Sequence, residues 1–241
     1  MLNTLSLENL LFLDIETVPA VKDLGTLSDH MQRLWFEKFA KIEPDSKDPS
    51  FGYSNKAGIY AEFGKIVCIS AGYFYSAGEQ KKFRIKSFFE EDEADLLKSF
   101  LDSTVQFAKK IPGFTFCGHN IKEFDIPYIC RRTMINGLDL PEPFQLYGKK
   151  PWEVSMVDTL HLWRFGDHKN YTSLDLMATV LNIPTPKDDI NGSKVAEVYW
   201  GEHDLPRIAA YCQKDVLTVA RLLLRFKQIP LLTEENVEIV S

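Results

Sequence analysis

Hydrophobic and polar residues alternate with two different periods along the first part of the chain. The apolar run from Leu10 to Ile15 predicts a buried central strand with Asp14 at its C-terminal end and a loop after it. Apolar residues then recur at helical spacing from residue 26 to 42, where Ser28 or Thr26 can cap a helix. The pattern therefore begins with one strand and one helix.

A β-hairpin is predicted next, after a loop over residues 44–60. Residues 64–75 and 82–89 are rich in β-branched and aromatic side chains, which favour strands. The small residues at 76–78 between them form a turn signal. Two strands joined by a short turn pair antiparallel.

The rest of the chain predicts helices and short strands in alternation. We expect a helix over 91–110, a strand over 114–117, a helix over 125–136, a strand over 154–158, and then successive helices to residue 228. Gly166, Pro184, Pro186 and Gly201 are expected to separate these last helices. An antiparallel hairpin combined with crossover units predicts an α/β fold, with a mixed sheet covered by helices on both faces.

Composition supports one folded domain over residues 1–241. Hydrophobic residues make up 45% of the chain and charged residues 26%, which is enough apolar material for one substantial core. The apolar N-terminal run lacks a basic lead and the length of a membrane span. Cys68, Cys117, Cys130 and Cys212 lack the short paired spacing of a zinc site or disulfide framework, which favours a reducing cytoplasm.

The formal net charge of −6 argues against a protein that binds nucleic acid through a long basic groove. It does not exclude a nuclease, because a cluster of carboxylates holding divalent cations presents positive charge locally. Net charge alone therefore decides little about function.

Three short segments carry candidate acidic ligands. Asp14 and Glu16 are two apart on a strand, so their side chains leave the same face and can share a metal ion. Tyr211 and Asp215 are four apart in an apolar helical stretch and share one helix face. Asp125 follows a predicted strand, where it or Asn120 could instead cap the next helix. Each segment taken alone is more often structural than catalytic, but their joint occurrence in this order favours a metal site.

The three segments together resemble the motifs of the DEDD exonucleases, tyrosine variety, in the ribonuclease H-like superfamily. The matching strings are DIET at 14–17, HNIKEFD at 119–125 and YCQKD at 211–215. Within that group, the chain is similar to stand-alone exonucleases related to the proofreading domain of family B DNA polymerases, over roughly residues 9–227. The resemblance implies a ribonuclease H-like mixed sheet of five strands.

The same resemblance implies a 3′-5′ exonuclease that uses two divalent cations, Mg²⁺ or Mn²⁺. Asp14, Glu16 and Asp215 would hold the ion that generates the attacking hydroxide. Asp14, with Asp125 acting through water, would hold the ion that stabilises the leaving 3′ oxygen. Tyr211 would orient the water, because its ordinary pKa of about 10 makes it a poor general base.

Substrate contacts are also expected from the resemblance. Asn120 would touch the penultimate nucleotide, and Phe124 would support the Asp125 turn, although a core role for Phe124 is common. Thr17 and His119 are further candidates for substrate contacts. For His119 we favour a loop histidine that is hydrogen-bonded to the backbone. For Asp158 we favour a helix N-cap over a supporting role behind the metal ligands.

The expected substrate is the 3′ end of a single-stranded nucleic acid, with DNA favoured over RNA, and the expected products are nucleoside 5′-monophosphates. Two other readings stay open. A haloacid-dehalogenase-like phosphatase would explain an Asp after a strand, but it expects Asp at the position of Glu16 and leaves the YCQKD segment unexplained. A catalytically silent nucleic-acid-binding module with the same fold is the other.

Overall fold

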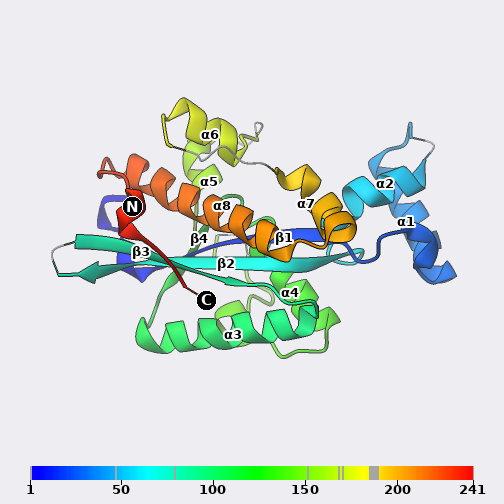
Figure 1. Ribbon diagram of the computed structural model, residues 1–241, viewed down its shortest axis with the longest axis horizontal. Coiled ribbons are helices and arrows are strands. Elements are labelled where there is room, and N and C mark those ends of the chain that lie inside the picture. The colour runs from blue at the N-terminus through cyan, green and yellow to red at the C-terminus, as the bar shows by residue number, and fades with distance from the viewer. Residues whose placement is uncertain are drawn as a thin grey trace.

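A computed structural model describes residues 2–46, 48–78, 80–150, 152–167, 169, 171–184 and 190–240. Its centre is a six-stranded sheet with the strand order β5-β4-β1-β2-β3-β6 (Figure 1). The strands are β1 (Leu10–Pro19), β2 (Gly64–Ala77), β3 (Gln80–Phe88), β4 (Thr115–Gly118), β5 (Met156–Asp158) and β6 (Val237–Val240).

The sheet is mixed, as the sequence predicts. β1 pairs antiparallel with β2, and β2 pairs antiparallel with β3 in the expected hairpin. β4 pairs parallel with β1, and β5 pairs parallel with β4. The three-strand antiparallel part and the parallel part therefore meet at β1, which lies inside the sheet.

The expectation of five strands was wrong, because β6 adds a sixth. β6 lies beyond residue 227 and pairs parallel with β3, with Phe83 opposite Val237. Glu238 on β6 accepts hydrogen bonds from the Arg84 guanidinium and the Tyr75 hydroxyl. These bonds and the pairing with β3 hold β6 at the edge of the sheet.

Helices cover both faces of the sheet. α3 and α4 lie on one face, and α8 crosses the other (Figure 1). A short π-helix over Val198–Glu202 follows α7. The α-helices are α1 (Asp29–Ile42), α2 (Pro49–Lys56), α3 (Glu93–Lys110), α4 (Asp125–Ile135), α5 (Thr159–Arg164), α6 (Leu174–Val180), α7 (Val195–Glu197) and α8 (Leu205–Phe226).

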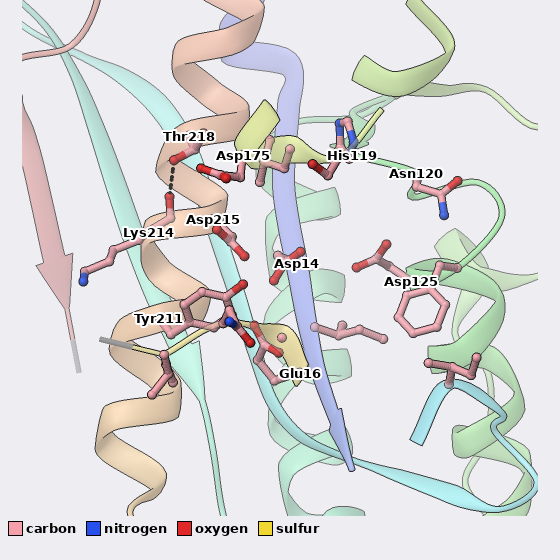
Figure 2. Close-up of a pocket in the computed structure, with 18 of the residues that line it drawn as sticks. Asp14, Glu16, His119, Asn120, Asp125, Asp175, Tyr211, Lys214, Asp215 and Thr218 are labelled. Carbon is pink, nitrogen blue, oxygen red and sulfur yellow. Dashed lines mark hydrogen bonds between the residues drawn. The ribbon is translucent and has the colours of Figure 1, made fainter. Parts of the chain in front are cut away.

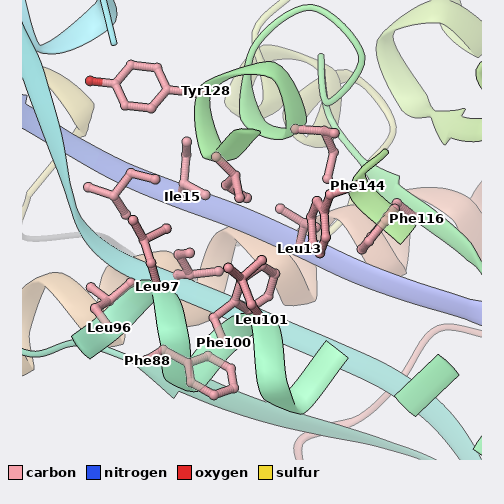
Figure 3. Packing of buried hydrophobic residues seen from close by; sticks show 14 of the residues in the cluster. Leu13, Ile15, Phe88, Leu96, Leu97, Phe100, Leu101, Phe116, Tyr128 and Phe144 are labelled. Carbon is pink, nitrogen blue, oxygen red and sulfur yellow. The ribbon is translucent and has the colours of Figure 1, made fainter. Parts of the chain in front are cut away.

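β1 divides its side chains between the two faces because successive strand residues point in opposite directions. Leu11, Leu13 and Ile15 pack among the apolar residues of α3 and α4, as Figure 3 shows for Leu13 and Ile15. Leu10 and Phe12 pack under α8. The next two positions on the α8 side are Asp14 and Glu16, so acidic side chains follow apolar ones on the same face of β1.

Two local expectations differ from the structure. Residues 44–60 were expected to form a loop, but α2 lies there, started by Pro49 and by Asp48, whose carboxylate accepts from the N–H groups of Ser50 and Phe51. Gly201 does not separate two helices, since it lies within the π-helix, and the chain leaves helical geometry at His203 with a φ of 57°. Pro186 lies outside the described residues.

Across the described ranges, each helix is either too short or too polar to cross a bilayer.

Candidate active site

β1 carries Asp14 and Glu16 on the face that α8 covers. The strand does not end at Asp14 as expected, because its pairing with β2 continues to Pro19, opposite Gly64. A register shift between Glu16 and Thr17 interrupts the ladder just after the second acid. The two carboxylates therefore lie in the middle of a strand that β2 holds along one edge, just beyond the Leu10–Phe12 pairing with β4 on the other edge.

α8 brings Tyr211 and Asp215 over these acids. The helix begins at Leu205 after Asp204, whose side chain accepts from the N–H of Arg207. Four residues of helix return nearly to the same face, and Figure 2 shows Tyr211 and Asp215 directed toward Glu16 and Asp14.

The fourth acid, Asp125, is the first residue of α4. Figure 2 shows its carboxyl group on the other side of Asp14 from Asp215. The side chain is buried, with an exposed fraction of 4%. β1, the first residue of α4 and α8 thus bring the four acids together in one cluster.

Asp158 holds the loop that precedes Asp125. Its carboxylate accepts from the backbone N–H groups of Asn120 and Lys122, and it also caps α5 by accepting from Leu160 and His161. The predicted N-cap is therefore confirmed, and the same group additionally positions the loop at Asn120. Asn120 has a φ of 62°, an uncommon conformation for a residue with a side chain.

A cleft of about 1150 Å³ opens over the acidic cluster. Of the predicted site residues, every one except Thr17 lines it. The lining also includes residues that the sequence did not single out, namely Ile15, Ile59, Tyr171, Ser173, Leu174, Asp175, Ile190, Asn191, Gly192, Lys194, Lys214 and Thr218.

Thr17 points away from the cleft because it follows Glu16 on the strand and faces the side of α4, beside Tyr128. His119 lies at the cleft wall with both ring nitrogens occupied. Nδ1 is 3.0 Å from the Thr159 hydroxyl, and Nε2 is 2.9 Å from the carbonyl oxygen of Thr172. Burial lowers the pKa of His119, so the ring is neutral and anchors a loop, as the stronger sequence reading has it.

Asp14, Glu16 and Asp125 hold their protons unusually tightly. Burial is the main cause, and mutual repulsion adds to it. The pKa of Asp14 is raised well above its ordinary range by burial and then by Asp215 and Asp125, and that of Glu16 by burial and then by Asp14. Burial also raises the pKa of Asp125 to about 7.

Such a cluster fits divalent cations. Buried like charges are unfavourable unless opposite charge compensates them, and hard cations such as Mg²⁺ prefer carboxylate oxygens. Asp14, which is partly open to the cleft, and the buried Glu16 have ligand atoms within 4.8 Å of each other. The donor set is therefore suited to the metal chemistry that the sequence predicts.

Tyr211 keeps its proton at neutral pH. Burial raises the pKa of its hydroxyl, and the negative charges of Asp215 and Glu16 raise it further. The hydroxyl can therefore donate a hydrogen bond in the cleft but cannot act as a base, in agreement with the role expected from sequence.

Cys212 is a neighbour of the cluster that the sequence did not single out. Its thiol donates toward the Asp14 backbone carbonyl at 3.3 Å and toward the Asp14 carboxylate at 3.5 Å. Burial, followed by the neighbouring Cys68 thiol, raises the pKa of Cys212, so the sulfur remains a neutral donor. Its position between Tyr211 and Asp215 on α8 is the only sequence signal that could have indicated it.

Tyr171 and Lys194 also line the cleft, and the hydrophobic pattern of the sequence around them did not indicate this. Both belong to the segment between α5 and α8, where helices are short and the hydrophobic period is broken.

A family model and the solved structures that match this chain agree with each other. A family model described as "Predicted 3'-5' exonuclease related to the exonuclease domain of PolB" matches residues 59–238. Asp125, Tyr211 and Asp215 lie inside that match, whereas Asp14 and Glu16 precede it. Among curated proteins there is no match.

A solved structure of the family B DNA polymerase from the hyperthermophilic archaeon Pyrobaculum calidifontis is similar in fold. It matches with a TM-score of 0.53 and 19% sequence identity over 90% of this chain. The chain corresponds to only 24% of the length of that polymerase. The mixed α/β architecture agrees with the predicted ribonuclease H-like fold, with six strands in place of five. Because the family model covers most of the sequence, this chain belongs to the family of predicted 3′-5′ exonucleases related to the exonuclease domain of PolB.

Proposed function

We propose that this protein removes nucleotides from the 3′ end of a single-stranded nucleic acid by metal-dependent phosphodiester hydrolysis. Water attacks phosphorus at the last phosphodiester bond, the bond to the leaving 3′ oxygen breaks, and a nucleoside 5′-monophosphate leaves. The observation that carries this proposal is the convergence of Asp14, Glu16, Asp125 and Asp215 in one cleft.

The four carboxylates would hold two divalent cations, Mg²⁺ or Mn²⁺. Asp14 lies between Asp125 and Asp215 in Figure 2, so it is placed to contribute to both ions. Bound there, the ions would lower the pKa of a coordinated water and offset charge on the phosphate. The raised carboxyl pKa values support this assignment, because compensating positive charge favours the ionised form of each acid.

The remaining groups would orient the reactants. The protonated Tyr211 hydroxyl donates to the attacking water. The 3′ end of the nucleic acid lies along the cleft wall that contains Asn120 and Phe124. The side-chain carbonyl oxygen of Asn120 is buried without a hydrogen-bond partner in the described part of the chain. That oxygen is suited to accept from an N–H or O–H group of the substrate.

DNA is the proposed substrate because the family is related to the exonuclease domain of a DNA polymerase. A net charge of −6 also favours local binding at a strand end over binding along many phosphates. Both arguments concern preference, so the test includes RNA of the same sequence.

The test is degradation of 5′-labelled single-stranded DNA and RNA with Mg²⁺, Mn²⁺ or chelator. We expect a ladder that shortens from the 3′ end, requires metal, and forms faster on DNA. Asp14→Asn should slow it on the order of 10³-fold, since loss of a shared metal ligand removes several kcal/mol of transition-state stabilisation. Asp102→Asn, an exposed acid on α3, is the matched control and should degrade the strand at the wild-type rate.

Intact oligonucleotides under all metal conditions, combined with measurable binding of the labelled strand, would instead establish the silent binding module. Cleavage at internal positions, or from the 5′ end, would contradict the proposed polarity. Equal rates on DNA and RNA would remove only the preference for DNA.

A further inference from the structure

Tyr171 is an exposed aromatic residue at the edge of the cleft. Its exposed fraction is 65%, although the residue lines the cavity over the acidic cluster. It does not belong to any of the buried apolar clusters of the described chain. At the edge of the cleft, this exposed tyrosine offers an aromatic face on which a ligand can pack.

The loop that carries Tyr171 is tied down immediately after it. The next residue, Thr172, has its carbonyl oxygen 2.9 Å from Nε2 of His119, whose Nδ1 in turn contacts the Thr159 hydroxyl. Ser173 caps α6 by accepting from the N–H of Leu176. The Tyr171 ring meets the His119 ring at 6.4 Å between centroids and 72° between planes. The ring position is therefore set by bonds of the backbone that follows it.

The ring also lies close to the acids that would hold the cations. Although the residue as a whole is 65% exposed, its hydroxyl group is partly buried, and this burial, followed by the charges of Asp125, Asp14 and Asp158, raises its pKa. Asp14 and Asp125 face each other across the cleft floor, and His119 lies above them (Figure 2). A strand whose phosphate reaches these acids has its neighbouring bases within reach of Tyr171.

We propose that Tyr171 is a stacking platform for an unpaired nucleobase next to the scissile phosphate. This inference rests on the proposed function and deepens it by naming what selects a single strand. Bases in a duplex are stacked and paired on both sides, whereas a frayed or single-stranded end can place a base face on the ring. Stacking also suits an acidic protein, because it does not depend on neutralising phosphates.

The experiment measures binding of fluorescein-labelled single-stranded DNA whose last linkages are phosphorothioates, by anisotropy in the presence of Mg²⁺. A tetrahydrofuran abasic nucleotide is placed in turn at the first, second and sixth positions from the 3′ end. The proteins are the wild type, Tyr171→Ala, Tyr171→Phe, and Tyr147→Ala as a matched control, since Tyr147 is 68% exposed but lies outside the cleft.

We expect the abasic nucleotide at the first or second position to weaken wild-type binding by about 10-fold, in line with the usual contribution of one stacked base. Tyr171→Ala should lose that discrimination, while Tyr171→Phe and Tyr147→Ala keep it. A uniform loss of affinity in Tyr171→Ala with unchanged base discrimination would overturn the inference, and so would discrimination at the sixth position alone. If the wild type degrades unmodified strands but Tyr171→Ala keeps the wild-type base discrimination, the stacking role of Tyr171 is wrong and the exonuclease proposal stands. If the wild type does not degrade unmodified strands, the exonuclease proposal is wrong, and with it the stacking role that rests on it.

Discussion

The two faces of β1 carry opposite chemistry within a few residues. On the α3 side, Leu11, Leu13 and Ile15 continue one buried apolar cluster. On the α8 side, Phe12 is followed by Asp14 and Glu16, and Val18 then returns to an apolar cluster with residues of α8. One face contributes stability without any ligand, whereas the other concentrates charge that burial makes unfavourable.

The α3 face of β1 therefore supplies apolar packing alone, whereas the α8 face combines its own apolar packing with the acidic cluster. A strand held only by its acidic face would be destabilised by mutual repulsion between the carboxylates. Changes on the two faces should therefore have separable effects, on folding in one case and on metal-dependent properties in the other.

The largest effect should come from removing an aromatic ring on the α3 side. Phe100 is 1% exposed and meets Phe88 and Phe144 edge to face. Phe100→Ala should lower the free energy of unfolding by about 3–5 kcal/mol, because it removes buried area and leaves a cavity. Chemical denaturation would measure this loss. Below the unfolding transition, kcat per folded molecule should stay at the wild-type value, and a fall in kcat would show that the two faces are not separable.

A smaller effect should appear when pH is varied without metal. The folded pKa of Asp125 is about 7, well above the ordinary value of 3.8, so the folded state holds a proton that the unfolded state has released. Between about pH 4 and 7 the free energy of unfolding should therefore fall as pH rises, by up to about 1.4 kcal/mol per pH unit for this group. Denaturation in chelator across this range would measure the slope.

Asp125→Asn and saturating Mg²⁺ are the matched tests of the same slope. The substitution should flatten it and raise the stability of the metal-free protein at pH 8, because a repelling charge is gone. Mg²⁺ should flatten it by binding the ionised carboxylates of the folded state. A slope that is identical in chelator and in Mg²⁺ would argue that the cluster does not bind the cation.

The smallest effect should come from substitution of Cys212, whose thiol contacts Asp14. Its thiol donates to Asp14, so Cys212→Ala should weaken cation binding by about 10-fold, as is usual when a group that orients a metal ligand is lost. Cys212→Ser keeps a donor and should restore most of the affinity. Calorimetric titration with Mn²⁺ measures both variants, and equal weakening by Ala and Ser would assign Cys212 a packing role only.

The cluster could be predicted because its signals are local. Side chains two residues apart on a strand, or four residues apart on a helix, share a face. Asp14 and Glu16 follow the first rule, and Tyr211 and Asp215 follow the second. The antiparallel hairpin of the mixed sheet was predicted from the same kind of local pattern, because two long strands, β2 and β3, flank a clear turn signal.

The missed features depend on contacts between distant segments. The thiol of Cys212 meets Asp14 across nearly the whole sequence, and β6 is a strand only because β3 offers an edge to it. Tyr171 lines the cleft because His119 holds the residue after it. α2 is different, since Asp48 and Pro49 form a local start signal that the surrounding polar residues obscured.

The long separation between the acidic segments has a consequence for how the protein is made. Asp14, Asp125 and Asp215 are spread over about 200 residues, so the ribosome adds that many residues between the first and the last of them. Contacts between such distant residues also form slowly, because a long stretch of chain must be ordered first. A growing polypeptide therefore lacks the complete acidic cluster until the residues of α8 have been added.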